Sequence, residues 1–98
     1  MLDKLTLLDF APLVTDRFRL IESDLTLDLE LLYAEAATLS GHQGSARAPF
    51  SLIFRGPAEP LLAQRIYSVQ HSALGVLEIF LVPIGPDGSG QRYEAVFS

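Results

Sequence analysis

The sequence predicts a small antiparallel β-barrel or sandwich of five to six strands, with one short N-terminal helix. Apolar and polar residues alternate in several short segments, as they do in strands that bury one face. Turn-forming residues separate these segments, and the chain lacks the strand–helix–strand alternation of a parallel sheet. At 98 residues the chain is expected to form a single domain, residues 1–98.

Composition narrows the class of protein. With 49% hydrophobic and 19% charged residues, the chain can bury a core without disulfides or metals, and it has no cysteine to form thiolate sites or nucleophiles. A net charge of −5 with scattered basic residues argues against nucleic acid as a partner. No apolar stretch approaches the roughly 20 residues of a membrane helix, and no signal peptide is recognisable. We therefore expect a cytoplasmic protein that does not bind membranes.

The first predicted element is a short helix. Asp9 is a suitable N-cap, Pro12 then falls in the first turn, and Leu8 and Leu13 take the two positions of a hydrophobic staple. The helix should end within residues 14–16, where Thr and Asp favour a turn. The apolar side chains expected to cover one end of the core are Leu5, Leu8, Phe10, Leu13 and Val14.

Residues 17–30 predict a β-hairpin with paired charges. A two-residue loop at Ser23 and Asp24 sorts apolar from charged side chains in a single register and matches opposite signs across the strands. The facing pairs in this register are Phe18–Leu29, Leu20–Leu27, Arg17–Glu30 and Arg19–Asp28. This pattern supports the β class more strongly than any other segment.

The second strand of the hairpin is long. Clean alternation from residue 25 to residue 33 slips at Leu31–Tyr33, which predicts a β-bulge. A helix over Leu29–Leu39 remains an alternative, because this stretch is rich in Leu, Ala and Glu. Residues 40–49 form a loop by composition.

A third strand is predicted at Phe50–Arg55. Gly56-Pro57 should stop it, and Ala58–Arg65 should form a connection. Leu61 and Leu62, within this connection, are expected to pack under the sheet.

The last third of the chain is predicted to be a meander. Ile66–His71 and Val76–Pro83 flank a turn in which Gly75 can adopt a positive φ. A symmetric turn gives the facing pairs His71–Val76, Val69–Glu78 and Tyr67–Phe80.

The strand after this turn is apolar over residues 76–82 apart from Glu78, so we expect it to be covered on both sides. Residues 85–90 are rich in Gly and lead to a last strand, Gln91–Phe97. This Gly-rich segment lacks the Gly-Lys-Ser/Thr ending of a phosphate loop and precedes a strand, which indicates a hairpin loop.

Acidic side chains on the long strand are the first candidates for chemistry. In the predicted register Asp28 and Glu30 already face arginines, so with Asp24 they are interpreted as a solvated strand face. Calcium would require six to eight convergent oxygens, which this stripe alone does not supply.

The two histidines are the next candidates. Neither His42 nor His71 has the spacing of a metal-binding pair, and His71 is expected to hydrogen-bond to the adjacent turn. A triad of Ser72, His71 and Glu78 can be written down, but no Gly-x-Ser-x-Gly motif supports it.

Arg55 ends an apolar strand and should place its guanidinium at a sheet margin. We expect it to pair with Glu59 or Glu78 or to cap backbone carbonyls, with recognition of a partner's carboxylate as the alternative.

Several segments carry a family resemblance. They are Leu5-Thr6-Leu7, Asp9-Phe10, Phe54-Arg55-Gly56-Pro57, Tyr67, His71, Leu74-Gly75, Phe80-Leu81-Val82-Pro83, Gly85-Pro86-Asp87 and Arg92-Tyr93-Glu94-Ala95-Val96-Phe97. Together they resemble a family of small bacterial proteins classed as a domain of unknown function. The resemblance covers nearly the whole chain and implies an accessory or assembly role beside phage-tail-collar-like proteins. It implies no catalytic residue.

The leading functional hypothesis is a non-enzymatic protein–protein interaction or assembly module that binds through a sheet edge or loop tips. No catalytic, cofactor-binding or metal-binding residue is assigned, and no cofactor is expected. The alternative is a small-ligand-binding β-barrel with Arg55 and His71 as polar anchors in an apolar cavity. An enzyme is the third hypothesis. An unpaired edge strand would invite a homo-oligomer, and the sequence leaves the oligomeric state open.

Overall fold

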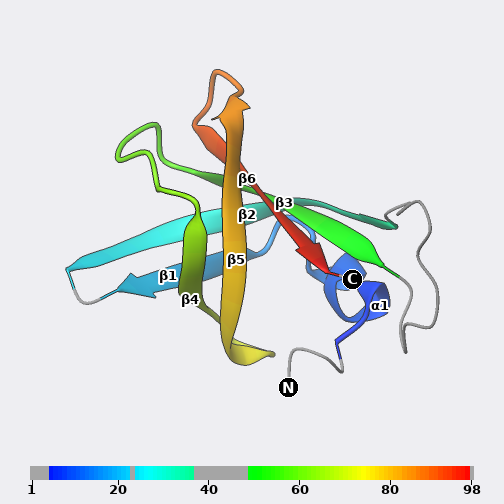
Figure 1. The fold of residues 1–98 in the computed structure, drawn as a ribbon. Coiled ribbons are helices and arrows are strands. Elements are labelled where there is room, and N and C mark those ends of the chain that lie inside the picture. Colours follow the sequence, from blue (N-terminus) through cyan, green and yellow to red (C-terminus); the bar gives the residue numbers. More distant parts are fainter. Residues whose placement is uncertain (1–4, 23, 37–48, 98) are drawn as a thin grey trace.

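The computed structural model describes residues 5–22, 24–36 and 49–97. Within these ranges six antiparallel strands form a closed barrel, preceded by a short helix (Figure 1). The elements are α1 (Leu7–Phe10), a 3-10 helix η2 (Ala11–Leu13), β1 (Arg17–Glu22), β2 (Leu25–Ala36), β3 (Phe50–Gly56), β4 (Arg65–His71), β5 (Gly75–Pro86) and β6 (Gln91–Phe97). Around the barrel the strands follow the order β1-β2-β3-β6-β5-β4, and β4 pairs with β1. The predicted antiparallel β fold with a short N-terminal helix is confirmed, as a barrel and not a sandwich.

The β1–β2 hairpin has the predicted register. The two strands pair from Arg17 opposite Glu30 to Glu22 opposite Leu25. Their fully buried side chains are Phe18, Leu20, Leu29 and Leu31. Alternation and cross-strand charge matching therefore identified both the pairing and the inward face, while Ser23 itself lies outside the described residues.

A bulge interrupts β2 where the apolar period slips. The pairing of β2 with β3 shifts between Leu31 and Tyr33. Leu31 is buried, Tyr33 is exposed on the outer face, and Ala34 packs against the core after the shift. One inserted residue thus exchanges the inward and outward positions, as predicted. The helical alternative is wrong for residues 29–36, which are strand throughout.

β3 and the connection that follows it match the prediction in part. β3 extends one residue beyond its predicted end, to Gly56, and the predicted loop 40–49 lies outside the described residues apart from its last residue. Leu62 is buried as expected, but Leu61 is exposed to solvent. The amide of Leu62 donates a hydrogen bond of 3.0 Å to the Tyr93 hydroxyl, and this anchor turns Leu62 inward while its neighbour points outward.

β4 and β5 pair one residue away from the predicted register. His71 lies opposite Gly75 and not opposite Val76. The same register gives the pairs Tyr67–Ile79, Val69–Leu77 and Ile66–Phe80. The turn therefore holds three residues, 72–74, and Gly75 has the positive φ (77°) that ends such three-residue loops. The predicted pairs are wrong because they assume a four-residue turn.

β5 is covered on one side only, which corrects the expectation of burial on both. Its inward side chains are Leu77, Ile79 and Leu81. Val76 and Phe80 alternate with them and are about half exposed, because the described residues place no second layer over the outside of the barrel at β5. β5 also runs on to Pro86, with a second register shift between Pro83 and Gly85.

The N-terminal helix begins earlier than predicted. Its N-cap is Thr6, and the Thr6 amide donates a 2.7 Å hydrogen bond to the carboxylate of Asp9 at the third helical position. Asp9 is therefore the acidic member of a capping box and not the N-cap. Pro12 consequently falls in η2, and Leu8 is exposed instead of forming a staple. The turn predicted near residue 15 is present, with Thr15 at a φ of 80°.

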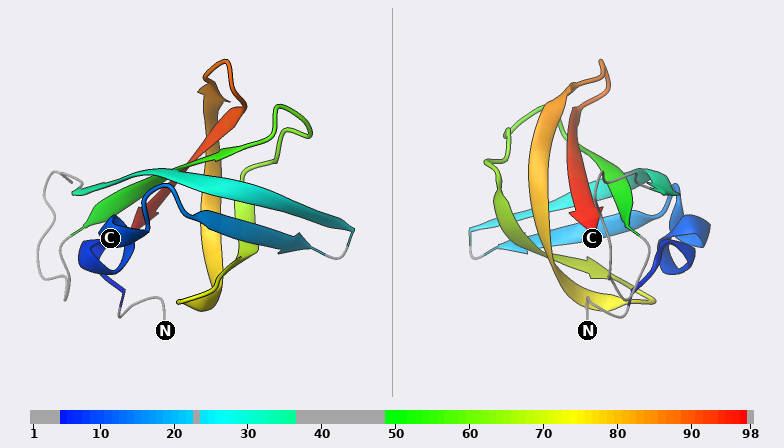
Figure 2. Two further views of the ribbon diagram at one scale, coloured as in Figure 1. Left: turned by 180° about the vertical axis from the view of Figure 1, so that it is seen from behind. Right: turned by 45° about the vertical axis from the view of Figure 1, so that its right-hand side comes forward.

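Aromatic packing attaches the helix to one end of the barrel. The ring of Phe10 lies 5.7 Å from those of Phe50 and Phe97, which stack on each other at 4.7 Å. Figure 2 shows α1 beside the start of β3 and the C-terminal end of β6. Phe10 joins a single cluster of buried apolar side chains from all six strands, so the barrel interior is a packed core.

Candidate functional site

Arg55 lies on the outer face of β3 and forms a charged cluster with two acids. Its Nη2 and Nε atoms lie 2.8 and 2.9 Å from Oδ2 of Asp87, and its Nη1 lies 3.4 Å from Oε1 of Glu30. The prediction that Arg55 forms an ion pair with an acidic residue is confirmed. The predicted partners Glu59 and Glu78 are wrong, because the register of the outer face places Glu30 directly opposite Arg55 and the β5–β6 turn brings Asp87 over it.

Asp87 links this cluster to the β5–β6 turn. Its Oδ1 accepts a 2.9 Å hydrogen bond from the Ser89 amide, and its own amide donates to the Gly90 carbonyl at 3.1 Å. The hydrogen bond from Arg55, reinforced by that of the Ser89 amide, lowers the pKa of Asp87 below its ordinary value of 3.8. Arg55 therefore fastens the β5–β6 turn to β3. The predicted hairpin loop at 85–90 is present at residues 87–90, because Gly85 and Pro86 belong to β5.

This arrangement makes stability depend on pH in acid. Because the pKa of Asp87 is lower in the folded protein than in the unfolded chain, the stability that the pair contributes is present above about pH 3.8 and is lost as the pH falls below it. We expect Asp87→Asn to reduce stability at pH 7 and to flatten the decline below pH 3.8, measured by urea unfolding at a series of pH values. Part of the decline should remain, since the hydrogen bond from Arg65 lowers the pKa of Glu22 in the same way. An unchanged acid profile in Asp87→Asn would contradict this role.

His71 is held by hydrogen bonds at both ring nitrogens. Its Nδ1 accepts from the Ala73 amide at 3.0 Å, so Nε2 carries the proton and donates to Oδ2 of Asp16 at 2.9 Å. The side chain is buried, and its ring lies 4.6 Å from the ring of Phe18. The predicted bond to the turn is confirmed, whereas Asp16 is a partner that sequence reasoning missed. His42 lies outside the described residues.

The structure does not assemble the triad of Ser72, His71 and Glu78. The carboxylate of Glu78 accepts a hydrogen bond from the hydroxyl of Ser68, and Ala73 and Asp16 engage the two imidazole nitrogens. Within the described part of the chain, no group of three or more His, Cys, Asp or Glu side chains could hold a metal ion. No helix in the same residues is both long and apolar enough to cross a bilayer.

Arg55 and His71 are not brought together. Arg55 contacts acids on the outside of the barrel, whereas His71 is buried against Phe18 at the end of β4, and the two have no partner in common. Between the strands, the buried apolar side chains of all six strands pack together as one core cluster.

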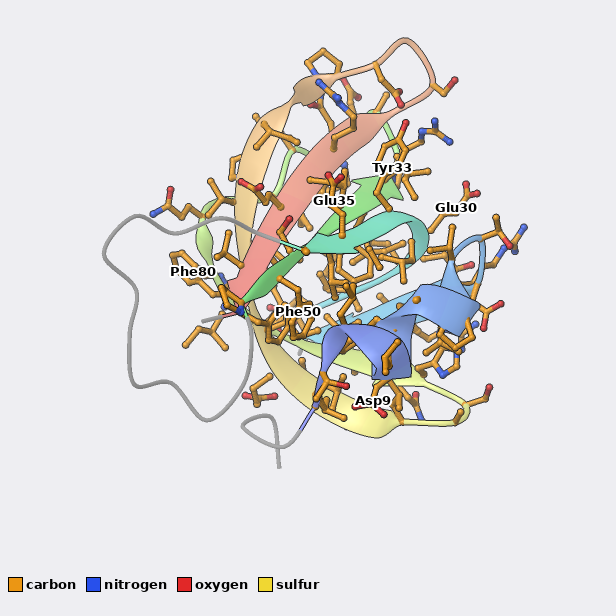
Figure 3. All side chains as sticks on the ribbon, turned by 90° about the vertical axis from the view of Figure 1, so that its right-hand side faces the viewer. Asp9, Glu30, Tyr33, Glu35, Phe50 and Phe80 are labelled. Atoms are coloured by element: carbon orange, nitrogen blue, oxygen red, sulfur yellow. The ribbon has the colours of Figure 1, made fainter. Side chains whose placement is uncertain are left out.

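The feature that sequence reasoning missed is an apolar surface on β4 and β5. Ile66 and Phe80 lie opposite each other in the register, with 55% and 47% of their surface exposed, and Val76 is 56% exposed at the other end of β5. We call these three residues the outer β4–β5 face. Figure 3 shows Phe80 on the outside of the barrel, whereas Phe50 lies beside the helix, where its ring packs against that of Phe10. The apolar run at residues 76–82 could have indicated an exposed apolar face, but such a run also fits a strand that is buried on both sides.

Polar groups lie both within and beside the outer β4–β5 face. The pair formed by Ser68 and Glu78 lies between its two ends, where these residues face each other across the strands. Near Ile66, Nη2 of Arg65 lies 2.8 Å from Oε1 of Glu22. The outer β4–β5 face therefore consists of the Ile66–Phe80 pair and Val76, separated by a hydrogen-bonded polar pair and bordered by an ion pair beside Ile66.

A family model for a domain of unknown function, DUF6916, matches residues 5–97. The chain belongs to this family. Comparison with curated proteins and with solved structures gave no match. The DUF6916 match spans every described helix and strand, which agrees with the family resemblance found in the sequence.

The structure gives physical roles to segments that carried the family resemblance in the sequence. Phe54-Arg55-Gly56-Pro57 and Gly85-Pro86-Asp87 meet through the ion pair between Arg55 and Asp87. His71 and Gly75 define the two ends of the β4–β5 turn. These segments therefore stabilise the ends of the barrel strands, and the outer β4–β5 face is one of the places where the described residues leave large apolar side chains in solvent.

Proposed function

We propose that this DUF6916 domain is a non-enzymatic protein–protein interaction or assembly module and that its outer β4–β5 face docks the partner. The observation that carries the proposal is the exposure of Ile66 and Phe80 side by side on a barrel whose other described aromatic rings are mostly buried. Large apolar side chains that stay in water cost free energy, and a partner that covers them removes that cost.

Closure of the barrel determines how a partner can approach. The sequence hypothesis placed the contact at a sheet edge or at loop tips, but β1 and β4 pair with each other and remove the free edges along the paired residues. A partner would instead lie flat on the outer face, with apolar side chains over Ile66 and Phe80. It would also carry groups that complement Glu78, between the apolar positions, and Glu22 and Arg65, beside Ile66.

The proposed setting follows the family resemblance. We propose a bacterial cytoplasmic domain that assists the assembly of phage-tail-like structures, with another protein and not nucleic acid or a membrane as its partner. The net charge of −5 supports the exclusion of nucleic acid, since phosphate binding depends on clustered basic residues. The alternative of a ligand inside the barrel gains no support, because Arg55 and His71 have separate partners and apolar side chains from all six strands pack together in the interior.

The test compares Phe80→Asp with Tyr33→Asp. Both positions carry an exposed aromatic side chain on the outside of the barrel, but Tyr33 belongs to β2. Loss of a central interface aromatic costs at least about 2 kcal/mol, so Phe80→Asp should weaken partner binding more than about tenfold, whereas Tyr33→Asp should bind as the wild type does. Binding is measured by quantitative affinity capture, with size-exclusion chromatography to detect a second copy of the chain as the partner.

Two outcomes would contradict the proposal. Equal binding by the two variants would show that the interface does not lie on β4 and β5. A strictly monomeric wild-type protein that binds no partner would contradict the proposed interaction function. Circular dichroism of both variants is the folding control and should show an intact barrel, because both substitutions are at exposed positions.

A further inference from the structure

The seam that closes the barrel is short. β1 pairs with β4 over three positions, from Arg19 opposite Gln70 to Ile21 opposite Ser68, although β1 pairs with β2 along its whole length. Beyond Arg19 and Gln70 the two strands part. A solvent-accessible pocket of about 310 Å³ lies at this point, lined by Arg17, Phe18, Arg19, Asp28, Gln70 and Ser72.

Two guanidinium groups at this pocket share a single acidic partner, Asp28. Alternation along β1 places Arg17 and Arg19 on the outside of the barrel, where their side chains are 81% and 59% exposed. The register places Glu30 opposite Arg17, but the carboxylate of Glu30 pairs with Arg55 instead. Asp28 then serves both arginines at 3.8 and 3.6 Å, longer than the roughly 2.7–2.9 Å of a direct charge-assisted hydrogen bond.

The lining therefore has one positive charge in excess, within a chain whose net charge is −5. A guanidinium fork matches a carboxylate in both geometry and charge, and a single carboxylate would neutralise the lining. A phosphate dianion would instead bring a second negative charge close to Asp28. Gln70 and Ser72 add a neutral amide and a hydroxyl, which can donate hydrogen bonds to the same anion. The volume lies at the lower end of the range for small-ligand sites, about 300–1,000 Å³.

We propose that this opening of the β1–β4 seam is a binding site for a singly charged carboxylate. Arg17 and Arg19 bind the carboxylate oxygens, while Gln70 and Ser72 hydrogen-bond at its edge. The same chemistry can come from a small free acid or from the C-terminal carboxylate of a peptide. The site adjoins the outer β4–β5 face, because Gln70 lies opposite Val76, but none of its lining residues belongs to that face and the proposal does not rest on protein binding there.

The experiment is a titration of the ¹⁵N-labelled full chain followed by NMR, at constant ionic strength. The ligands are propionate, its uncharged analogue propionamide, inorganic phosphate, and a short peptide with either a free or an amidated C-terminus. We expect propionate to give saturable shifts at the Arg17 and Arg19 side chains and at the Gln70 and Ser72 amides, and propionamide to give none. The free-acid peptide binding more tightly than propionate would identify a peptide terminus as the source, and the reverse order would identify a small acid.

Variants separate this site from general attraction of anions to arginine. Arg17→Gln/Arg19→Gln should abolish the saturable shifts, while Arg65→Gln, a matched exposed arginine outside the pocket, should leave them unchanged. Asp28→Asn removes a unit charge about 4 Å from the ligand and should tighten binding about fivefold. Because these side chains are all on the surface, the variants should fold, and Asp28→Asn tests the site through a gain that unfolding does not produce.

Three results would overturn the proposal. They are shifts that do not saturate or that spread over every exposed arginine, equal responses to propionate and propionamide, and stronger binding of phosphate than of carboxylate at the same ionic strength. Unchanged affinity in Asp28→Asn would also place the anion elsewhere.

Discussion

Replacement of Phe10 by alanine should lower the free energy of unfolding by about 3–5 kcal/mol, the cost of removing a buried phenyl ring and leaving a cavity. Phe10 has no exposed surface, and its ring lies 5.7 Å from the rings of Phe50 and Phe97. It is the buried residue of α1, so its loss also removes the main contact that holds the helix against the barrel. Urea unfolding followed by circular dichroism measures the change.

Leu8→Ala is the matched control, because Leu8 lies in the same helix but is 81% exposed. It should change stability by less than about 0.5 kcal/mol, as surface substitutions usually do. If Phe10→Ala and Leu8→Ala had the same effect, the helix would not close the barrel end through Phe10.

Gly90→Ala is the second substitution with a large expected effect, a loss of about 3 kcal/mol or more. A Cβ atom at Gly90 would lie 2.1 Å from the carbonyl oxygen of Gly56, which is a backbone atom of β3 and cannot turn aside. The β5–β6 turn approaches β3 at this point and carries Asp87, the partner of Arg55. The substitution should therefore displace the turn and weaken that ion pair as well.

Gly56→Ala provides the comparison for this prediction. Its Cβ atom would meet Cδ2 of Leu29 at 2.9 Å, and that atom is the end of a flexible side chain. We expect Gly56→Ala to destabilise the barrel clearly less than Gly90→Ala in the same unfolding measurement. A loss in Gly90→Ala no larger than in Gly56→Ala would mean that the turn does not press against the β3 backbone.

Local patterns predicted the parts of the fold that local pairing determines. The β1–β2 hairpin was predictable because alternation and opposite charges agreed on one register, and the bulge at Leu31–Tyr33 was predictable because the apolar period changed there. The β4–β5 register was not, because a single residue in the turn decides it and Gly75 closes a three-residue loop. The N-cap was predicted wrongly as Asp9, because an Asp is suitable both as an N-cap and as the third residue of a capping box whose N-cap is Thr6.

Contacts between distant segments were beyond sequence reasoning. The pairing of β1 with β4, the turn of Glu30 toward Arg55 and the bond between Asp16 and His71 each join residues that no spacing relates. The candidate site changed for the same reason. Arg55 and His71, the predicted binding residues, are each held by partners within the chain. The exposure of Ile66 and Phe80 depends on which side of each strand faces the barrel interior, and this follows from the closed sheet.

The most direct measurement of the proposed docking role is site-specific photo-crosslinking in cells. A benzoylphenylalanine residue is placed at position 80 in one chain and at position 33 in another, since both native aromatics are exposed on the barrel exterior. Light should join the first chain to a distinct partner and leave the second almost unlinked. Crosslinks of equal yield from both positions, or from position 33 alone, would contradict a partner bound at β4 and β5.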